Sequence, residues 1–212
     1  MVAVADSWPS IAYLVWSYKG NYLLPTGVTV TVTAWSYCDG TLIATRQVLT
    51  AAHCIPTTVT FTYLGASYTG NVVTNTYYPT LESMIVIYLG LQDKSVIASD
   101  GTVPLPAVQR SILAIRKHPN WDSTTLLNDL ALLYLSSDVT LSTYIQVACL
   151  PSAVSSTYPG TNVFVYAAGW GKTSTNSSTL PTLLNNVKLT VYTASSCSYS
   201  NYFDAGQICA GI

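Results

Sequence analysis

Charged side chains are scarce in this chain. Asp, Glu, Lys and Arg make up 8% of its 212 residues, against about 25% in an average soluble domain. Eight basic and nine acidic residues give a net charge of −1, so the charge predicts neither a nucleic acid nor an anionic membrane as partner. The polar surface must therefore come from uncharged residues such as Ser, Thr, Asn and Tyr.

Long apolar runs, histidines and a leader-like start are also lacking. The longest apolar candidates, Ile11–Trp16 and Met84–Tyr88, are strand-sized and far below the ~18–20 residues of a membrane span. Residues Met1–Asp6 lack a basic start followed by an apolar stretch, so no signal peptide is expected. With only two histidines, we expect no metal site and no cofactor. The cysteine count, five, is odd, which predicts a free thiol, an intermolecular bridge or a missing partner.

What the chain does contain is the alternation of β-strands. Val28–Thr33 and Thr58–Tyr63 alternate with period two and are rich in β-branched residues. Further short strands are predicted at Ile11–Trp16, Thr41–Ile43, Met84–Leu89, Leu130–Leu135, Val163–Ala167 and Val187–Val191. Turn signals include Lys19-Gly20-Asn21, Asp39-Gly40, Asp100-Gly101 and His118-Pro119-Asn120. No long stretch has helical periodicity, so the pattern favours an all-β sandwich or barrel.

A loop rich in Ser, Thr and Asn is predicted at Thr173–Thr182. It contains the sequon Asn176-Ser177-Ser178. A glycan on Asn176 and a chance match in a Ser-rich loop both remain open.

The first chemically informative stretch is Val48-Leu49-Thr50-Ala51-Ala52-His53-Cys54. A lone histidine is usually structural, but His53 follows an apolar strand end and small residues, and it precedes a cysteine. A bridge from Cys54 to Cys38 upstream would close a short loop and hold His53 in place. In the chain-entropy model such a loop contributes about 3 kcal/mol.

The second stretch is Asn128-Asp129-Leu130-Ala131-Leu132-Leu133. A carboxylate at the head of an apolar strand is costly to bury unless it is hydrogen-bonded. By itself Asp129 could be either a turn residue ahead of a strand or a functional carboxylate.

Taken in order, these stretches resemble the boxes of the chymotrypsin/trypsin-like serine proteases. The His53 and Asp129 stretches are similar to the histidine and aspartate boxes of that family. The other matching stretches are Ser7-Trp8-Pro9-Ser10, Cys38-Asp39-Gly40-Thr41-Leu42-Ile43, His118-Pro119-Asn120-Trp121, Cys149-Leu150-Pro151, Ala168-Gly169-Trp170-Gly171 and Gln207-Ile208-Cys209-Ala210-Gly211. The match covers essentially the whole chain.

The resemblance implies an all-β fold of two six-stranded antiparallel β-barrels. It implies a complete first barrel over residues 7–139, then an inter-barrel segment and an incomplete second barrel over residues 140–212. It also implies serine endopeptidase chemistry, with His53 as general base and Asp129 as its orienting partner. His118, in a turn box, is expected to be structural.

The same resemblance implies pairings and surroundings. Cys38–Cys54 and Cys197–Cys209 match two bridges of the family, and Cys149 resembles a cysteine whose partner comes later. Secretion is implied, with polypeptide substrates or protein inhibitors as partners. Leu91 stands where calcium-binding trypsins place a carboxylate, so no calcium loop is expected.

Several features depart from the pattern. In the family, the Gly-Asp-Ser-Gly-Gly-Pro box should follow the stretch Ile208–Gly211. No Ser of the 212 residues lies in a Gly-x-Ser-Gly context, and no Ile-Val-Gly-Gly start is present. With Cys149 left over, these departures predict an inactive fragment of a working enzyme. The alternative is a non-enzymatic homologue that acts as a binding module. Asp39 also replaces a family glycine, and aspartate tolerates a positive φ better than most residues do.

Overall fold

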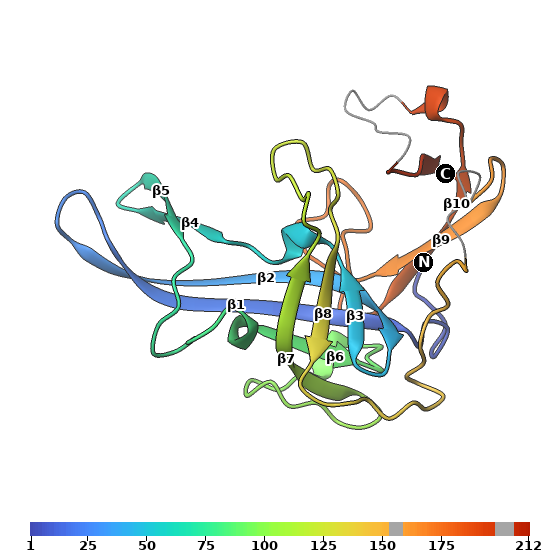
Figure 1. The fold of residues 1–212 in the computed structure, drawn as a ribbon, viewed down its shortest axis with the longest axis horizontal. Helices are drawn as coiled ribbons and strands as arrows, with labels where there is room; N and C mark the ends of the chain where they lie inside the picture. Colours follow the sequence, from blue (N-terminus) through green and yellow to red (C-terminus); the bar gives the residue numbers. More distant parts are fainter. Residues whose placement is uncertain (153–158, 198–205) are drawn as a thin grey trace.

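Strands dominate the computed structural model, which describes residues 1–152, 159–197 and 206–212 (Figure 1). The strands are β1 (Ile11–Leu23), β2 (Thr29–Ala44), β3 (Gln47–Thr50), β4 (Thr58–Tyr63), β5 (Ala66–Asn71), β6 (Ile85–Leu89), β7 (Val108–Lys117), β8 (Ala131–Leu135), β9 (Phe164–Gly169), β10 (Asn185–Val191) and β11 (Ala210–Gly211). Short 3₁₀ turns lie at η1 (Ala52–Cys54), η2 (Glu82–Met84), η3 (Lys94–Val96) and η4 (Ala194–Ser196). The predicted all-β class is confirmed. Within the described ranges, no helix is long and apolar enough to cross a membrane.

Six strands close into an antiparallel barrel in the order β1-β2-β3-β8-β7-β6. Alternate residues point inward along each strand, so β8 buries Ala131, Leu133 and Leu135. Closure removes the free sheet edges that an open sheet of this size would expose. Fully buried side chains fill the centre, among them Leu42, Val48, Ile87, Leu89, Leu133 and Leu135. The first barrel is therefore complete, as predicted.

A second, smaller sheet follows in the order β11-β10-β9. It is the partial second barrel that was predicted. The disulfide Cys197–Cys209 ties the chain after η4 to the residue just before β11. Between sheet and barrel, Trp170 meets Tyr13 edge-on with ring centroids 5.2 Å apart. A separate apolar cluster forms there, with Ala3, Tyr88, Leu91, Ala107 and Leu184. The boundary between residues 139 and 140 stays a prediction.

The β1–β2 hairpin extends far beyond the barrel (Figure 1). β6 pairs with β1 over Ala12–Trp16, and β3 pairs with β2 over Thr41–Ala44, whereas β1 and β2 pair with each other out to Leu23↔Thr29. We call residues 17–23 and 29–37 the arm. The arm is a two-stranded ribbon that leaves the barrel on one side.

Two predicted turns are wrong because they lie inside these strands. Lys19-Gly20-Asn21 is in β1, and Asp39-Gly40 is in β2. A Cβ on Gly20 would come within 2.0 Å of the Tyr18 hydroxyl, so this glycine makes room for a ring instead of bending the chain. The hairpin turns at residues 24–28 instead, where Gly27 has a φ of 82° that favours glycine.

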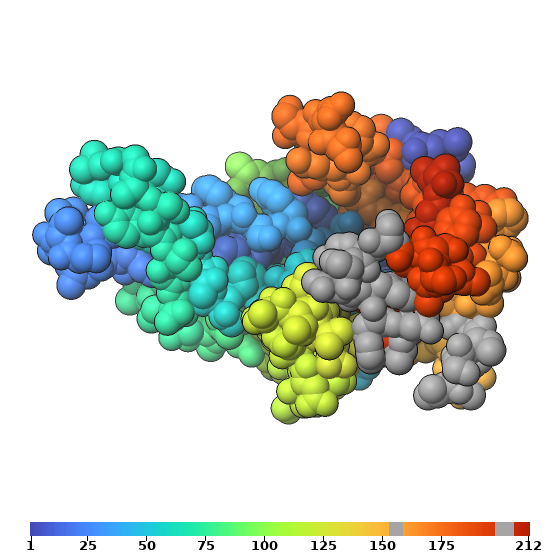
Figure 2. Space-filling model, turned by 90° about the horizontal axis from the view of Figure 1, so that it is seen from above, coloured from blue at the N-terminus to red at the C-terminus, as the bar shows by residue number. Residues whose placement is uncertain are grey.

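The β4–β5 hairpin covers the inner face of the arm. The predicted strand Thr58–Tyr63 has the bounds of β4, but it pairs with β5 outside the barrel. Phe61 lies 5.2 Å from Tyr22 and 5.7 Å from Tyr68, measured between ring centroids. Figure 2 shows this hairpin, in teal, packed over the blue tip of the arm. Arm and hairpin thus form a lobe with an aromatic interior.

Candidate active site

His53 lies on η1, which begins two residues after the end of the barrel strand β3. Ala52 and Cys54 on either side of it are buried, which directs the imidazole outward, with 59% of its side chain exposed. The disulfide Cys38–Cys54 fastens this turn to β2. The small residues and the cysteine noted in the sequence therefore do position the histidine.

Asp129 lies at the end of the β7–β8 connection, two residues before β8. Asn128 has a φ of 57°, and its side-chain amide donates to the Asn120 carbonyl at 2.8 Å. Asparagine is one of the few residues that adopt this conformation at low cost. The turn aims the Asp129 carboxylate at η1, across 76 residues of sequence.

His53 and Asp129 are joined by two hydrogen bonds. The Nδ1 of His53 lies 2.7 Å from Oδ2 of Asp129, and the backbone N–H of His53 donates to Oδ1 at 2.9 Å. An acceptor at Nδ1 holds the proton on that nitrogen, so Nε2 keeps its lone pair. A neutral imidazole held in this tautomer can take a proton at Nε2 from another group.

Lys117 is a neighbour of this pair that no sequence motif indicated. Its Nζ donates to the carbonyl of Ile55 at 2.7 Å, and it interacts electrostatically with Asp129. Burial lowers the pKa of Lys117, and the nearby Asp129 carboxylate acts in the opposite direction. Its position at the end of β7, one residue before His118, is the only signal that could have found it.

Other residues selected from the sequence take no part in the hydrogen bonds between His53 and Asp129. Nδ1 of His118 accepts the backbone N–H of Asn120 at 3.2 Å, the arrangement of a turn residue. Asn176 is exposed on a turn, and a glycan there stays a prediction. Cys149 is free and exposed. Within the described residues, Cys38, His53 and Cys54 are the one group of potential metal ligands, and both sulfur atoms are used in the disulfide.

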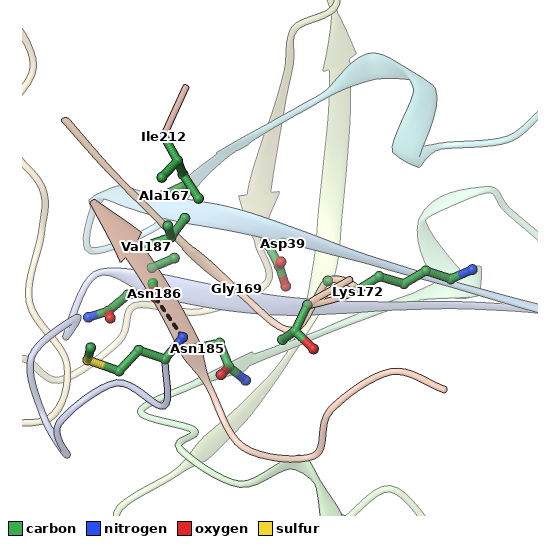
Figure 3. A pocket seen from close by; sticks show the side chains of 12 residues that line it. Asp39, Ala167, Gly169, Lys172, Asn185, Asn186, Val187 and Ile212 are labelled. Atoms are coloured by element: carbon green, nitrogen blue, oxygen red, sulfur yellow. Dashed lines mark hydrogen bonds between the residues drawn. The ribbon is translucent and has the colours of Figure 1, made fainter. Parts of the chain in front are cut away.

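Asp39 does not need the backbone conformation of the glycine that it replaces. It is not among the residues with positive φ, and it lies in extended β2, paired with Tyr13. Its Oδ2 accepts the backbone N–H of Trp170 at 3.2 Å, so it links the barrel to the second sheet. Figure 3 shows it at the wall of a cavity of about 490 Å³ between the two.

Substitution of Asp39 should show that its buried carboxylate lowers the stability of the fold in a pH-dependent way. Burial raises the pKa of its carboxyl above 3.8, more than the Trp170 N–H and Lys94 lower it. The folded state therefore binds the proton more tightly than the unfolded chain, so stability falls as the pH rises above 3.8 through the folded pKa. We expect Asp39→Asn, which can still accept from Trp170, to raise Tm by about 2–4 °C at pH 7.

Calorimetry at neutral pH and near pH 4 measures this effect. The gain should shrink at the lower pH, because the raised pKa leaves less of the wild-type carboxyl charged in the fold there than at neutral pH. Asp6→Asn is the matched control, since Asp6 is exposed. An Asp39→Asn variant that melts below the wild type at pH 7 would show that the charge is favourable where it lies.

The comparisons with known proteins agree with this architecture. The family model described as Trypsin matches residues 17–87 and 82–212. The chain is 29% identical over 213 residues to chymotrypsin-like elastase family member 1 of Bos taurus, covering 97% of this chain and 63% of that protein. It is 31% identical over 179 residues to a trypsin of Xenopus laevis, covering 84% of this chain and 59% of that protein. The chain thus spans less than two thirds of the length of these relatives.

A solved structure described as "Structure of GrC" is similar in fold. Its TM-score is 0.66 at 22% identity, and the match covers 100% of this chain and 74% of that one. At this level of identity the likeness shows the fold alone.

Proposed function

Because this chain belongs to the trypsin family, we propose that it carries the histidine and aspartate of a serine endopeptidase centre. In this proposal His53 is the general base and Asp129 orients it. The observation that carries the proposal is the pair of hydrogen bonds from His53 to Asp129, at 2.7 Å and 2.9 Å. The substrates are polypeptides, and the reaction is hydrolysis of a peptide bond.

The proposed roles of the two residues follow from the hydrogen bonds that join them. Asp129 uses both carboxylate oxygens on His53, one for the ring and one for the backbone. The ring can then rotate little, and the imidazolium that forms on proton transfer has its counter-charge in place. Nε2 would accept the proton of an attacking hydroxyl and later return it to the leaving amine.

The 212 residues by themselves are proposed to be inactive. No serine among them lies in a Gly-x-Ser-Gly context. Loss of the nucleophile alone lowers kcat by about 10⁶-fold in an analogous triad.

The proposal also covers the domains and the location of the protein. Residues 7–139 form one barrel unit, residues 140–212 belong to the second, and the protein is secreted. The two disulfides favour an oxidising compartment.

The tautomer of His53 tests the orienting role without any need for turnover. Long-range ¹H–¹⁵N NMR of the ring should show the Nδ1–H form in the wild type. In Asp129→Asn the amide can donate to Nδ1, so the Nε2–H form should dominate, with the fold unchanged. A wild type that shows the Nε2–H form would contradict the proposed centre.

A fluorophosphonate probe tests the claim of inactivity. The purified chain should acquire no covalent adduct by mass spectrometry under conditions in which an active trypsin is fully labelled. An adduct on any serine would refute that claim.

The alternative function is a binding module without catalysis, which the absence of a recognisable nucleophile among these residues favours. The transcript distinguishes the two. A reading frame that continues past Ile212 into Gly-Asp-Ser-Gly-Gly supports the endopeptidase, whereas a stop codon there supports the module.

A further inference from the structure

The arm has an unpaired strand edge on β2. β3 reaches β2 only at Thr41–Ala44, and within the described residues no backbone hydrogen bond joins residues 29–37 to any strand other than β1. The β4–β5 hairpin packs on the inner face of the arm and forms a sheet of its own. About 20 Å of β2 edge, from Thr31 to Tyr37, is therefore open to another strand.

The direction of the free groups follows from Asp39. Its carbonyl accepts the hydroxyl of Thr50 on β3, so it faces the β3 side of the strand. Backbone groups alternate between the two edges of a strand, and the β1–β2 register has no shift from Leu23↔Thr29 to Ile11↔Thr41. The N–H and C=O groups of Thr31, Thr33, Trp35 and Tyr37 therefore point outward on that same edge.

The arm lacks the devices that usually protect such an edge. Strand edges are commonly blocked by charged residues, prolines or bulges. Residues 28–38 contain no Asp, Glu, Lys, Arg or Pro, and the β2 irregularity lies outside the arm, between Leu42 and Ala44. The outer face also leaves Trp35 62% and Tyr37 49% exposed.

The edge leads to the proposed active site. Tyr37 precedes Cys38, whose disulfide to Cys54 holds the turn that carries His53. A strand laid along β2 would thus have one end beside His53 and the other end at the tip of the arm. Main-chain pairing with an open edge accepts many sequences, which suits a centre that acts on polypeptides.

We propose that the β2 edge of the arm, from Thr31 to Tyr37, is an auxiliary docking site for an extended segment of polypeptide substrate. The segment adds to β2 as a further strand and packs side chains on Trp35. The proposal rests on the proposed endopeptidase function for the identity of its ligand. A second copy of this chain is the competing occupant, because the uncharged edge could also pair with itself.

A binding titration tests the proposal on the 212-residue chain. The probe is a fluorescein-labelled peptide of ten alternating Thr and Val residues with lysines at both ends, followed by fluorescence anisotropy. Thr33→Pro removes one outward N–H and should spare the ladder to β1. Thr33→Val is the matched control, since it changes the side chain and keeps the donor.

We expect saturable binding that Thr33→Pro weakens by about tenfold or more and that Thr33→Val leaves unchanged. If Thr33→Pro fails to fold, the donors are removed from the probe instead of from the protein. A probe that is N-methylated at every residue should bind the wild type at least about tenfold more weakly, because neither of its edges keeps a backbone donor.

Other outcomes would overturn the docking site. These are equal affinity for Thr33→Pro and Thr33→Val, equal affinity for the N-methylated probe, or no saturable binding at all. Dimerisation in sedimentation that Thr33→Pro abolishes would assign the edge to a second copy. None of these readouts involves His53, so the docking site can fail while the His53 tautomer still supports the catalytic centre, and the reverse.

Discussion

Replacement of Tyr18 by alanine is expected to lower the free energy of unfolding by about 3–5 kcal/mol, as deletion of a buried aromatic ring commonly does. Tyr18 is 1% exposed and lies inside the arm, where its ring neighbours those of Trp16, Tyr22 and Tyr78. Gly20 lies against the same ring, so its backbone cannot move in to fill the space without breaking the pairing with Val32. Urea unfolding followed by tryptophan fluorescence measures the loss.

Tyr77→Ala is the matched control for this prediction. Tyr77 is 61% exposed and contacts Lys19 through its ring, so its removal should cost less than about 1 kcal/mol. Hydrogen exchange separates the loss of the arm alone from the loss of the whole barrel. If Tyr18→Ala and Tyr77→Ala were equally stable, the aromatic interior of the lobe would contribute little to the fold.

The double replacement Cys38→Ser and Cys54→Ser is expected to lower the free energy of unfolding by about 3 kcal/mol. The bridge spans 16 residues, and a loop of that length constrains the unfolded chain by about this amount in the chain-entropy model. Both sulfur atoms lie at the base of the histidine turn, so we also expect η1 to lose protection of its amides. Denaturant unfolding and hydrogen exchange give the two quantities.

Cys149→Ser isolates the effect of the bridge from that of serine itself. Cys149 is free and exposed, so this variant should unfold at the wild-type denaturant concentration. A double variant within about 0.5 kcal/mol of the wild type would mean that the bridge does not stabilise the turn.

Local patterns determined much of the fold in advance. The alternation in Thr58–Tyr63 gave the bounds of β4, and the apolar run after Asp129 gave β8 nearly to the residue. Periodicity of two carries this information because strand side chains alternate regardless of the partner. The long strand Val108–Lys117 was missed, since its polar residues interrupt the apolar pattern that marked the others.

Glycine and aspartate signals failed where packing overrode local preference. Gly20 and Asp39-Gly40 have the composition of turns, yet all three lie in extended strands. The space beneath the Tyr18 ring explains Gly20, and the N–H of Trp170 gives the Asp39 carboxylate a partner across the two sheets. Neither contact is visible to a window of neighbouring residues.

The sequence by itself determined the class of the fold, the family boxes and the two side chains proposed for catalysis. These are properties of short stretches, because strand alternation and motif spacing are local. Only the tertiary structure decided that Asp129 meets both the ring and the backbone of His53, since those residues are 76 positions apart. It also decided that β2 runs past its neighbours to leave an open edge, because pairing depends on where every other strand ends.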